Sequence, residues 1–181
     1  MESGPALILQ TLDKYLTAPG AIRLFGGAAL VLGYGRQRLT EDADLLLDDA
    51  ECRALIDGSG FSEAVEATNA ELNVLGLYLT HIFGPEQEIL SPSWREQCRE
   101  VTVPGLTKLT VSVLGPIDLV LTKLGRGDEG DFDDIRYLIA SEHLSAAALR
   151  DALASALVPE VLNEIHVQAR EKLFALLSSE P

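Results

Sequence analysis

The spacing of two short motifs constrains this chain most. The first, Gly26-Gly27, directly follows an apolar run over residues 22–25 that predicts a short buried strand. The second places Asp42 and Asp44 at the start of another apolar run, which predicts a second strand. One predicted helix and one short loop separate the motifs. This order brings both motifs to one corner of an α/β layer.

The two glycines suit a phosphate-binding turn. Glycine backbone adopts unusual dihedral angles and lets a ligand approach closely. The helix predicted over 28–34 begins just after them, and a helix N-terminus offers N–H groups and partial positive charge. We therefore predict that Gly26 and Gly27 bind the phosphates of a nucleotide. The alternative is that they only allow the strand and the helix to pack closely.

The two aspartates suit a divalent metal ion. Residues two apart on a strand point to the same face, so Asp42 and Asp44 are expected side by side. Close carboxylates repel each other unless a cation lies between them. Mg²⁺ prefers such oxygen ligands and completes its shell with water and substrate phosphates. We predict that the pair holds Mg²⁺ or Mn²⁺, with a solvated strand end as the alternative.

The remaining elements predict an α/β part, residues 1–115, and a C-terminal helical part, residues 116–181, packed on it as one structural unit. Residues 61–74 are ambiguous and are interpreted as a mixed connection. Strands are predicted over 22–25, 43–47, 75–83, 98–103 and 108–113, and helices over 5–17, 28–34, 48–57, 116–124, 131–140, 145–156 and 159–177.

A third motif lies in the helical part. Lys123 and Arg126 are three residues apart and therefore share a helix face. Lysine as a point charge and arginine as a planar fork are both good phosphate ligands. Asp131 and Asp134 follow on the next predicted helix. The alternative is a purely structural helix–turn–helix in which these four residues form ion pairs.

With these motifs in this order, the sequence resembles the nucleotidyltransferase superfamily, whose members carry Gly-Gly or Gly-Ser, a helix, and then Asp-x-Asp or Asp-x-Glu. The segment Arg-Leu-Thr-Glu-Asp-Ala-Asp over 38–44 looks like the Arg-x-Thr-x-Asp-x-Asp form of small bacterial and archaeal members, which relate to the AbiEii/MenT-type toxins of type IV toxin–antitoxin systems. The third motif is similar to their Lys-x-x-Arg and Asp-x-x-Asp segment. The resemblance covers about residues 22–140.

The resemblance implies a polymerase-beta-like α/β (α+β) fold, with a mixed sheet, flanking helices and a C-terminal helical part. It implies catalytic roles for Lys123 and Asp131 beside the metal-holding aspartates, with Arg126 and Asp134 as second choices. The predicted site therefore has two sets: catalytic Asp42, Asp44, Lys123 and Asp131, and nucleotide-binding Gly26, Gly27, Arg38, Thr40 and Arg126.

One expected acid is missing from the pattern. Many relatives carry a third carboxylate on a later strand, here predicted over 75–83, but Thr80 and His81 occupy the corresponding positions. His81 is a candidate base because the ordinary pKa of histidine is near neutral, although a packed histidine is the commoner case. Glu86 and Glu88 lie just beyond the strand.

Composition and charge exclude several classes of function. The formal net charge is −14, with 28 acidic and 14 basic residues, which argues against broad DNA or RNA binding through neutralised phosphates. The sequence shows no signal peptide and no apolar run of membrane-spanning length, so no membrane association is expected. Two isolated cysteines fit a reducing cytoplasm.

The function predicted from the sequence is transfer of a nucleotidyl group from an NTP to an unidentified acceptor, which is RNA, a protein or a small molecule. The alternative is a catalytically inactive nucleotide-binding or protein-binding domain of the same fold. An apolar stripe on the last helix predicts core packing, with the surface of a homodimer or of a cognate antitoxin complex as the alternative. Its residues are Val161, Leu162, Ile165, Ala169, Leu173 and Leu177.

Overall fold

The computed structural model describes residues 3–179, except for the side chains of residues 80, 81 and 179. The chain forms two compact units. Unit 1 runs to Gly84 and adds Cys98–Leu114, and unit 2 comprises Pro85–Gln97 and the chain from Gly115 onward. The division into residues 1–115 and 116–181 as folding domains stays a prediction. Unit 2 includes a segment before that division.

Five strands form the sheet of unit 1: β1 (Gly20–Phe25), β2 (Asp42–Leu46), β3 (Tyr78–Phe83), β4 (Arg99–Val101) and β5 (Leu109–Val113). Their order is β3-β2-β1-β5-β4. β1 pairs in parallel with β5 and antiparallel with β2, β2 pairs in parallel with β3, and β4 pairs antiparallel with β5. The sheet is mixed, so the predicted fold class is confirmed.

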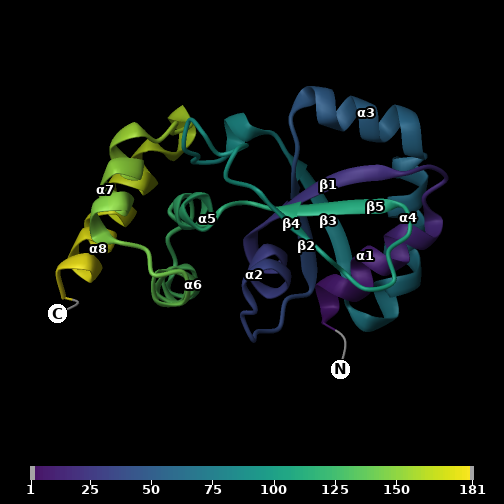
Figure 1. Ribbon diagram of the computed structural model, residues 1–181, viewed down its shortest axis with the longest axis horizontal. Helices are drawn as coiled ribbons and strands as arrows, with labels where there is room; N and C mark the ends of the chain where they lie inside the picture. The colour runs from purple at the N-terminus through teal and green to yellow at the C-terminus, as the bar shows by residue number, and fades with distance from the viewer. Residues whose placement is uncertain (1–2, 180–181) are drawn as a thin grey trace. The chain divides into compact units, whose positions relative to one another are not determined.

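Helices cover both faces of this sheet unequally (Figure 1). The helices α1 (Gly4–Tyr15), α2 (Gly26–Tyr34) and α4 (Phe61–Leu72) lie on one face, and α3 (Asp49–Ser59) lies on the other. α2 packs so tightly on β5 that a Cβ at Gly33 would be 2.7 Å from a methyl group of Val113. Leu24 is the register partner of Val113 and lies on the same face of the sheet. Arg23 lies on the opposite face, where it bonds to Glu51 of α3.

Asp13 connects the end of α1 to the start of β5. Its carboxylate accepts hydrogen bonds from the backbone N–H groups of Thr107, Lys108 and Leu109 and from the Thr107 hydroxyl. Burial by itself raises the pKa of Asp13, but these backbone hydrogen bonds outweigh burial and lower the pKa below its ordinary value. The loop before β5 is therefore fixed by one ionised side chain.

Unit 2 is helical, as predicted for the end of the chain. Its helices are α5 (Pro116–Lys123), α6 (Glu129–Ser141), α7 (Ala146–Ser155) and α8 (Asn163–Ser179). Unit 2 also contains the short 3-10 helices η2 (Pro85–Gln87) and η3 (Glu160–Leu162), and a third, η1 (Asn73–Leu75), lies in unit 1. Fully buried Asp118 of α5 accepts from the N–H and the hydroxyl of Ser91. Burial raises the pKa of Asp118 above its ordinary value, although the Ser91 bonds oppose the rise.

Two expectations for the helices were wrong in detail. The segment 61–74 is not a mixed connection, because α4 occupies most of it and buries Phe61, Ala64, Thr68 and Leu72 at helical spacing. The apolar stripe of the last helix is buried at Ala169, Leu173 and Leu177, but Val161 is 86% and Ile165 42% exposed.

Among residues 3–179, no helix is both long and apolar enough to cross a bilayer.

Candidate functional site

The first glycine of the Gly-Gly motif is required by backbone geometry. β1 ends at Phe25 and α2 begins at Gly26 without an intervening loop. Gly26 has a φ of +63°, in the left-handed region that favours glycine. A Cβ added there would lie 3.2 Å from Oδ2 of Asp44. The turn and the second aspartate therefore meet, as the sequence predicted for a single corner.

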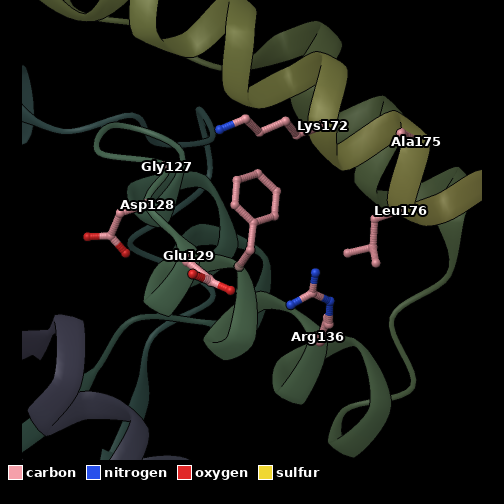
Figure 2. A pocket seen from close by; sticks show the side chains of 8 residues that line it. Gly127, Asp128, Glu129, Arg136, Lys172, Ala175 and Leu176 are labelled. Atoms are coloured by element: carbon pink, nitrogen blue, oxygen red, sulfur yellow. The ribbon is translucent and has the colours of Figure 1, made fainter.

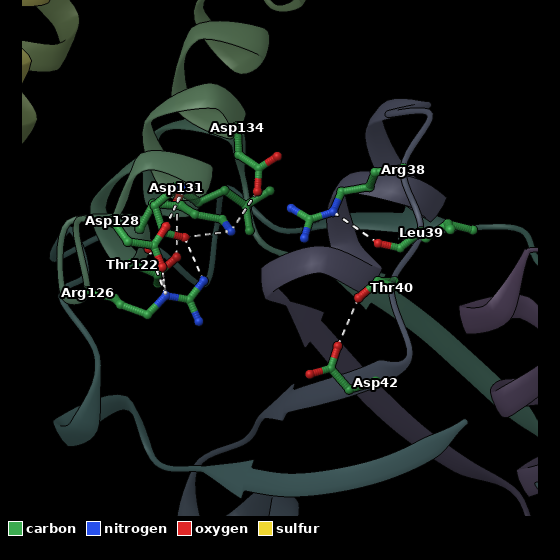
Figure 3. Close-up of polar contacts among 11 residues, drawn as sticks. Arg38, Leu39, Thr40, Asp42, Thr122, Arg126, Asp128, Asp131 and Asp134 are labelled. Atoms are coloured by element: carbon green, nitrogen blue, oxygen red, sulfur yellow. Dashed lines mark hydrogen bonds and ion pairs between the residues drawn. The ribbon is translucent and has the colours of Figure 1, made fainter. Parts of the chain in front are cut away.

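The second glycine is required by space instead. Gly27 is not among the residues with positive φ. A Cβ added to it would lie 2.7 Å from Oγ1 of Thr40 and 3.3 Å from the Thr40 Cβ. The Thr40 hydroxyl in turn donates a hydrogen bond of 2.8 Å to Oδ1 of Asp42 (Figure 3). Gly27, Thr40 and Asp42 thus form a chain of contacts from α2 to β2.

The two aspartates lie on one face of β2. In the sheet register, Asp44 is opposite Phe25 of β1 and Asp42 is opposite Tyr78 of β3. Both aspartates are half-buried, while Ala43 between them is fully buried on the other face. The sheet therefore presents the two carboxylates together, with the apolar core behind them.

The donor set at this corner fits a metal that takes part of its shell from a substrate. Within the described part of the chain, no group of three or more His, Cys, Asp or Glu side chains could hold a metal ion. Mg²⁺ typically binds through one or two carboxylates together with water and substrate phosphates. Asp42 and Asp44 supply that number of carboxylates, so Mg²⁺ or Mn²⁺ with a bound triphosphate is compatible with the residues present.

A β-bulge faces Asp44 where the third acid was expected. Ala43 pairs with Leu79 and Leu45 pairs with Ile82, so two residues of β3, Thr80 and His81, oppose one residue of β2. The side chains of these two residues lie outside the described part of the structure, and the role of His81 as a base stays a prediction. Glu86 and Glu88 belong to unit 2.

The third motif forms a buried ion-pair cluster in unit 2 (Figure 3). Lys123 ends α5, and its Nζ lies 3.0 Å from Oδ1 of Asp131 and 2.8 Å from Oδ2 of Asp134 on α6. Lys123 is 5% and Asp131 1% exposed. Asp131 also accepts two hydrogen bonds from Arg126, at 2.8 Å from Nε and 2.7 Å from NH2. The lysine is thus held between two carboxylates.

Charge balance within this cluster keeps Asp131 ionised. Burial by itself raises the pKa of Asp131, but the hydrogen bond from Arg126 and the charge of Lys123 outweigh burial, and the pKa lies below its ordinary value. Arg126 is the accessible member, because its side chain is 70% exposed. If this cluster contacts a phosphate, Arg126 can reach it without breaking the Lys123 ion pairs.

The predicted site residues therefore fall into two sets. Unit 1 holds Gly26, Gly27, Thr40, Asp42 and Asp44, with Arg38 exposed in the loop before β2, where its Nε lies 3.5 Å from the Leu39 carbonyl oxygen. Unit 2 holds Lys123, Arg126, Asp131 and Asp134. In unit 1, Gly26 lies beside Asp44 and Thr40 joins Gly27 to Asp42, and in unit 2 ion pairs join the four residues.

Sequence reasoning missed one ion pair on the sheet face that carries the aspartates. Arg23 of β1 bonds to Glu51 through NH1 at 2.9 Å and NH2 at 2.8 Å. The pair borders a pocket of about 270 Å³ between β1 and α3. An arginine inside an apolar strand was the visible signal, but its partner is 28 residues away and no local pattern identifies it.

A second hollow, of about 510 Å³, lies in unit 2 between α6 and α8 (Figure 2). Phe132 forms part of its wall, and Lys172 and Arg136 approach from the two helices. Lys172 Nζ is 5.7 Å from the centre of the Phe132 ring, and Arg136 pairs with Asp133 at 2.7 Å. None of the predicted site residues lines this hollow, and we assign it no role.

Comparison with known proteins agrees with this geometry. Residues 8–175 match the family described as "Nucleotidyltransferase of unknown function (DUF6036)". The chain belongs to this family, because the match spans nearly all of the sequence. No curated protein and no solved structure matches the chain. The fold and the family together define a nucleotidyltransferase-like protein.

Proposed function

We propose that this protein is a metal-dependent nucleotidyltransferase that transfers a nucleotidyl group from an NTP to an acceptor hydroxyl. The observation that carries the proposal is the corner where Gly26 of the turn approaches Asp44, while Thr40 joins Gly27 to Asp42. In this corner the N-terminus of α2, which favours phosphate, adjoins two carboxylates on one strand face. Membership of the family supports the same reaction class.

The chemistry requires one bond to form and one to break. The acceptor oxygen attacks the α-phosphorus of the NTP, the bond from that phosphorus to the bridging oxygen breaks, and pyrophosphate leaves. The acceptor proton passes to a base or to water. Mg²⁺ or Mn²⁺ held by Asp42 and Asp44 would neutralise charge on the phosphate oxygens.

The remaining residues bind and orient the substrate in this proposal. Gly26, Gly27 and the N-terminus of α2 hold the terminal phosphates and Arg38 offsets their charge, while Arg126 is a nucleotide ligand by resemblance. Both arginine side chains are exposed, and ion pairs with Asp128 and Asp131 hold the guanidinium group of Arg126. Lys123 and Asp131 complete the catalytic set by resemblance, and in the structure they also keep Arg126 in place.

Isothermal titration of each of the four NTPs in the presence of Mg²⁺ tests this function. The wild-type protein should bind at least one NTP, and the Asp42→Asn/Asp44→Asn variant should lose the Mg²⁺-dependent part of the affinity. Asparagine keeps the shape of aspartate, so a change in affinity reports the lost charge. If neither protein binds any NTP, the proposed enzyme is excluded.

A second candidate is a catalytically inactive nucleotide-binding or protein-binding domain. The sequence of β3, which has no acid, favours it. Incubation with α-³²P-labelled NTPs, Mg²⁺ and candidate RNA, protein or small-molecule acceptors separates the two. Tight NTP binding without label in any acceptor supports the inactive domain, whereas label that the Asp42→Asn/Asp44→Asn variant fails to transfer supports the enzyme.

The Arg-x-Thr-x-Asp-x-Asp segment supports a finer proposal, namely kinship with AbiEii/MenT-type toxins. On that proposal the acceptor is an RNA end and a cognate antitoxin is a partner. The exposed Val161 and Ile165 of unit 2 are compatible with such a contact or with a homodimer. Growth arrest on expression of the wild type, absent for the double variant, would support it.

A further inference from the structure

The Thr40 hydroxyl has a specific use in this structure. A hydroxyl group has one proton to donate, and Thr40 donates it to Oδ1 of Asp42 at 2.8 Å. In this arrangement Thr40 has no proton for a phosphate oxygen. The role of Thr40 as a direct nucleotide ligand stays a prediction, and the hydrogen bond to Asp42 indicates another use of the same hydroxyl.

Gly27 is matched to the same side chain. All three nearest atoms that a Cβ at Gly27 would meet belong to Thr40, at 2.7, 3.3 and 3.7 Å. Real Cβ atoms essentially never approach another atom as closely as the first of these distances. Because the φ of Gly27 is not positive, an alanine there is disfavoured by Thr40 and not by the backbone.

We propose that Thr40 is a positioning residue for the metal ligand Asp42. We also propose that position 27 requires glycine because any larger side chain would collide with Thr40. The hydrogen bond fixes the carboxylate through Oδ1, and Asp42 would hold the metal ion in this orientation. Groups that orient a metal ligand in this way set metal affinity without touching the metal. The inference rests on the proposed function, in which Asp42 holds the metal.

Titration of Mn²⁺ followed by electron paramagnetic resonance tests the role of Thr40. Thr40→Val keeps the side-chain shape but removes the hydroxyl, and it should weaken Mn²⁺ binding about tenfold or more, as losses of such orienting partners do. Thr40→Ser keeps the hydroxyl and should bind Mn²⁺ nearly as well as the wild type. Asp42→Asn/Asp44→Asn sets the baseline without the site.

Thr107→Val is the matched control. Thr107 also donates its hydroxyl to a carboxylate of unit 1, Oδ2 of Asp13 at 2.9 Å, but Asp13 is not part of the site. This variant should lower the melting temperature and leave Mn²⁺ affinity unchanged. Equal Mn²⁺ affinity of Thr40→Val and wild type would overturn the inference while leaving the metal site intact. A wild type that binds no Mn²⁺ would overturn the proposed metal site itself.

A double-mutant cycle tests the match between Gly27 and Thr40 without any metal. Gly27→Ala should lower the melting temperature when Thr40 is present, because the new methyl group meets Oγ1. In the Thr40→Ala background the same change should cost much less or raise the melting temperature, since alanine is the better helix former. An equal loss in both backgrounds would overturn the proposed match.

Discussion

At the scale of single residues, the buried cluster around Lys123 shows how one motif supports both alternatives drawn from the sequence. Its ion pairs to Asp131 and Asp134 are those of a structural helix–turn–helix. The same contacts orient Arg126, which stays exposed and can meet a ligand. The ion pairs therefore give Lys123 a structural role, and its catalytic role stays a prediction.

Replacing Lys123 with methionine should destabilise unit 2 strongly. The change leaves the buried Asp134 without this cation, and breaking a buried ion pair from one side costs about 3–5 kcal/mol; we expect the lower end, since Asp131 keeps Arg126. Urea unfolding measures the loss. Lys14→Met, which breaks an exposed pair with Glu71, is the control and should have little effect. Equal effects of both changes would contradict the cluster's structural role.

At the scale of elements, the sequence identified the helices and strands whose apolar residues recur with a clear period. It missed the features whose geometry depends on a partner element. The strand before Gly26 and the helix after it follow from apolar runs and glycine. α4 was missed because its buried stripe includes Ala64 and Thr68, which a hydropathy pattern does not recognise. The bulge at Thr80–His81 could not be foreseen, because it exists only in the pairing of β3 with β2.

Asp13, which ties α1 to β5, gives an element-scale prediction with a defined pH dependence. Because its folded-state pKa is depressed, its stabilisation is fully present above the ordinary pKa of 3.8 and is lost as the pH falls through the folded pKa. Asp13→Asn should lower the free energy of unfolding at pH 7 by about 1.5–3 kcal/mol, the scale of hydrogen bonds to a charged group.

Urea unfolding of wild type and Asp13→Asn, repeated from pH 7 down to pH 3, checks this prediction. The difference between the two proteins should shrink below pH 3.8, where Asp13 of the unfolded wild-type chain gains its proton before Asp13 of the folded protein does. Asp118→Asn is the contrasting variant. Because burial raises the pKa of Asp118, the stability that Asp118 contributes is present at low pH and is lost as the pH rises through the raised pKa. A constant difference for Asp13 across the range would contradict the assignment.

At the scale of the whole molecule, the sequence predicted the mixed sheet and the composition of the glycine–aspartate corner. Those predictions succeeded because chain order and strand alternation place Gly26 and Asp44 at one end of neighbouring strands. The close approach of Thr40 to Gly27 could not be predicted, because it depends on the distance between a helix and a loop. The partner of Arg23 was unpredictable for a similar reason, since the pairing is set by packing of α3 on the sheet.

The charge distribution of the whole chain gives a final prediction, on nucleic acid. Broad DNA binding needs many lysines and arginines that neutralise phosphates, and this chain has 14 of them against 28 acids. Several are already engaged within the fold: Lys123 is buried between carboxylates, Lys108 donates to backbone carbonyls at the end of α1, and Arg23 is paired with Glu51. Random-sequence duplex DNA should therefore bind more weakly than the about 10⁻⁴–10⁻⁶ M usual for non-specific binding.

Fluorescence anisotropy of a labelled random duplex, titrated with the protein at low and at physiological salt, measures this affinity. Both titrations should remain flat, because the net charge of −14 repels the phosphate backbone and low salt strengthens that repulsion. The Asp42→Asn/Asp44→Asn variant serves as the control and should behave alike, since two charges of 28 hardly change the overall field. Binding in the micromolar range that weakens steeply with salt would show a basic surface that the distribution of charges does not predict. An RNA acceptor would then bind through that surface, and selection of the acceptor would not depend on the corner around Asp42 and Asp44 alone.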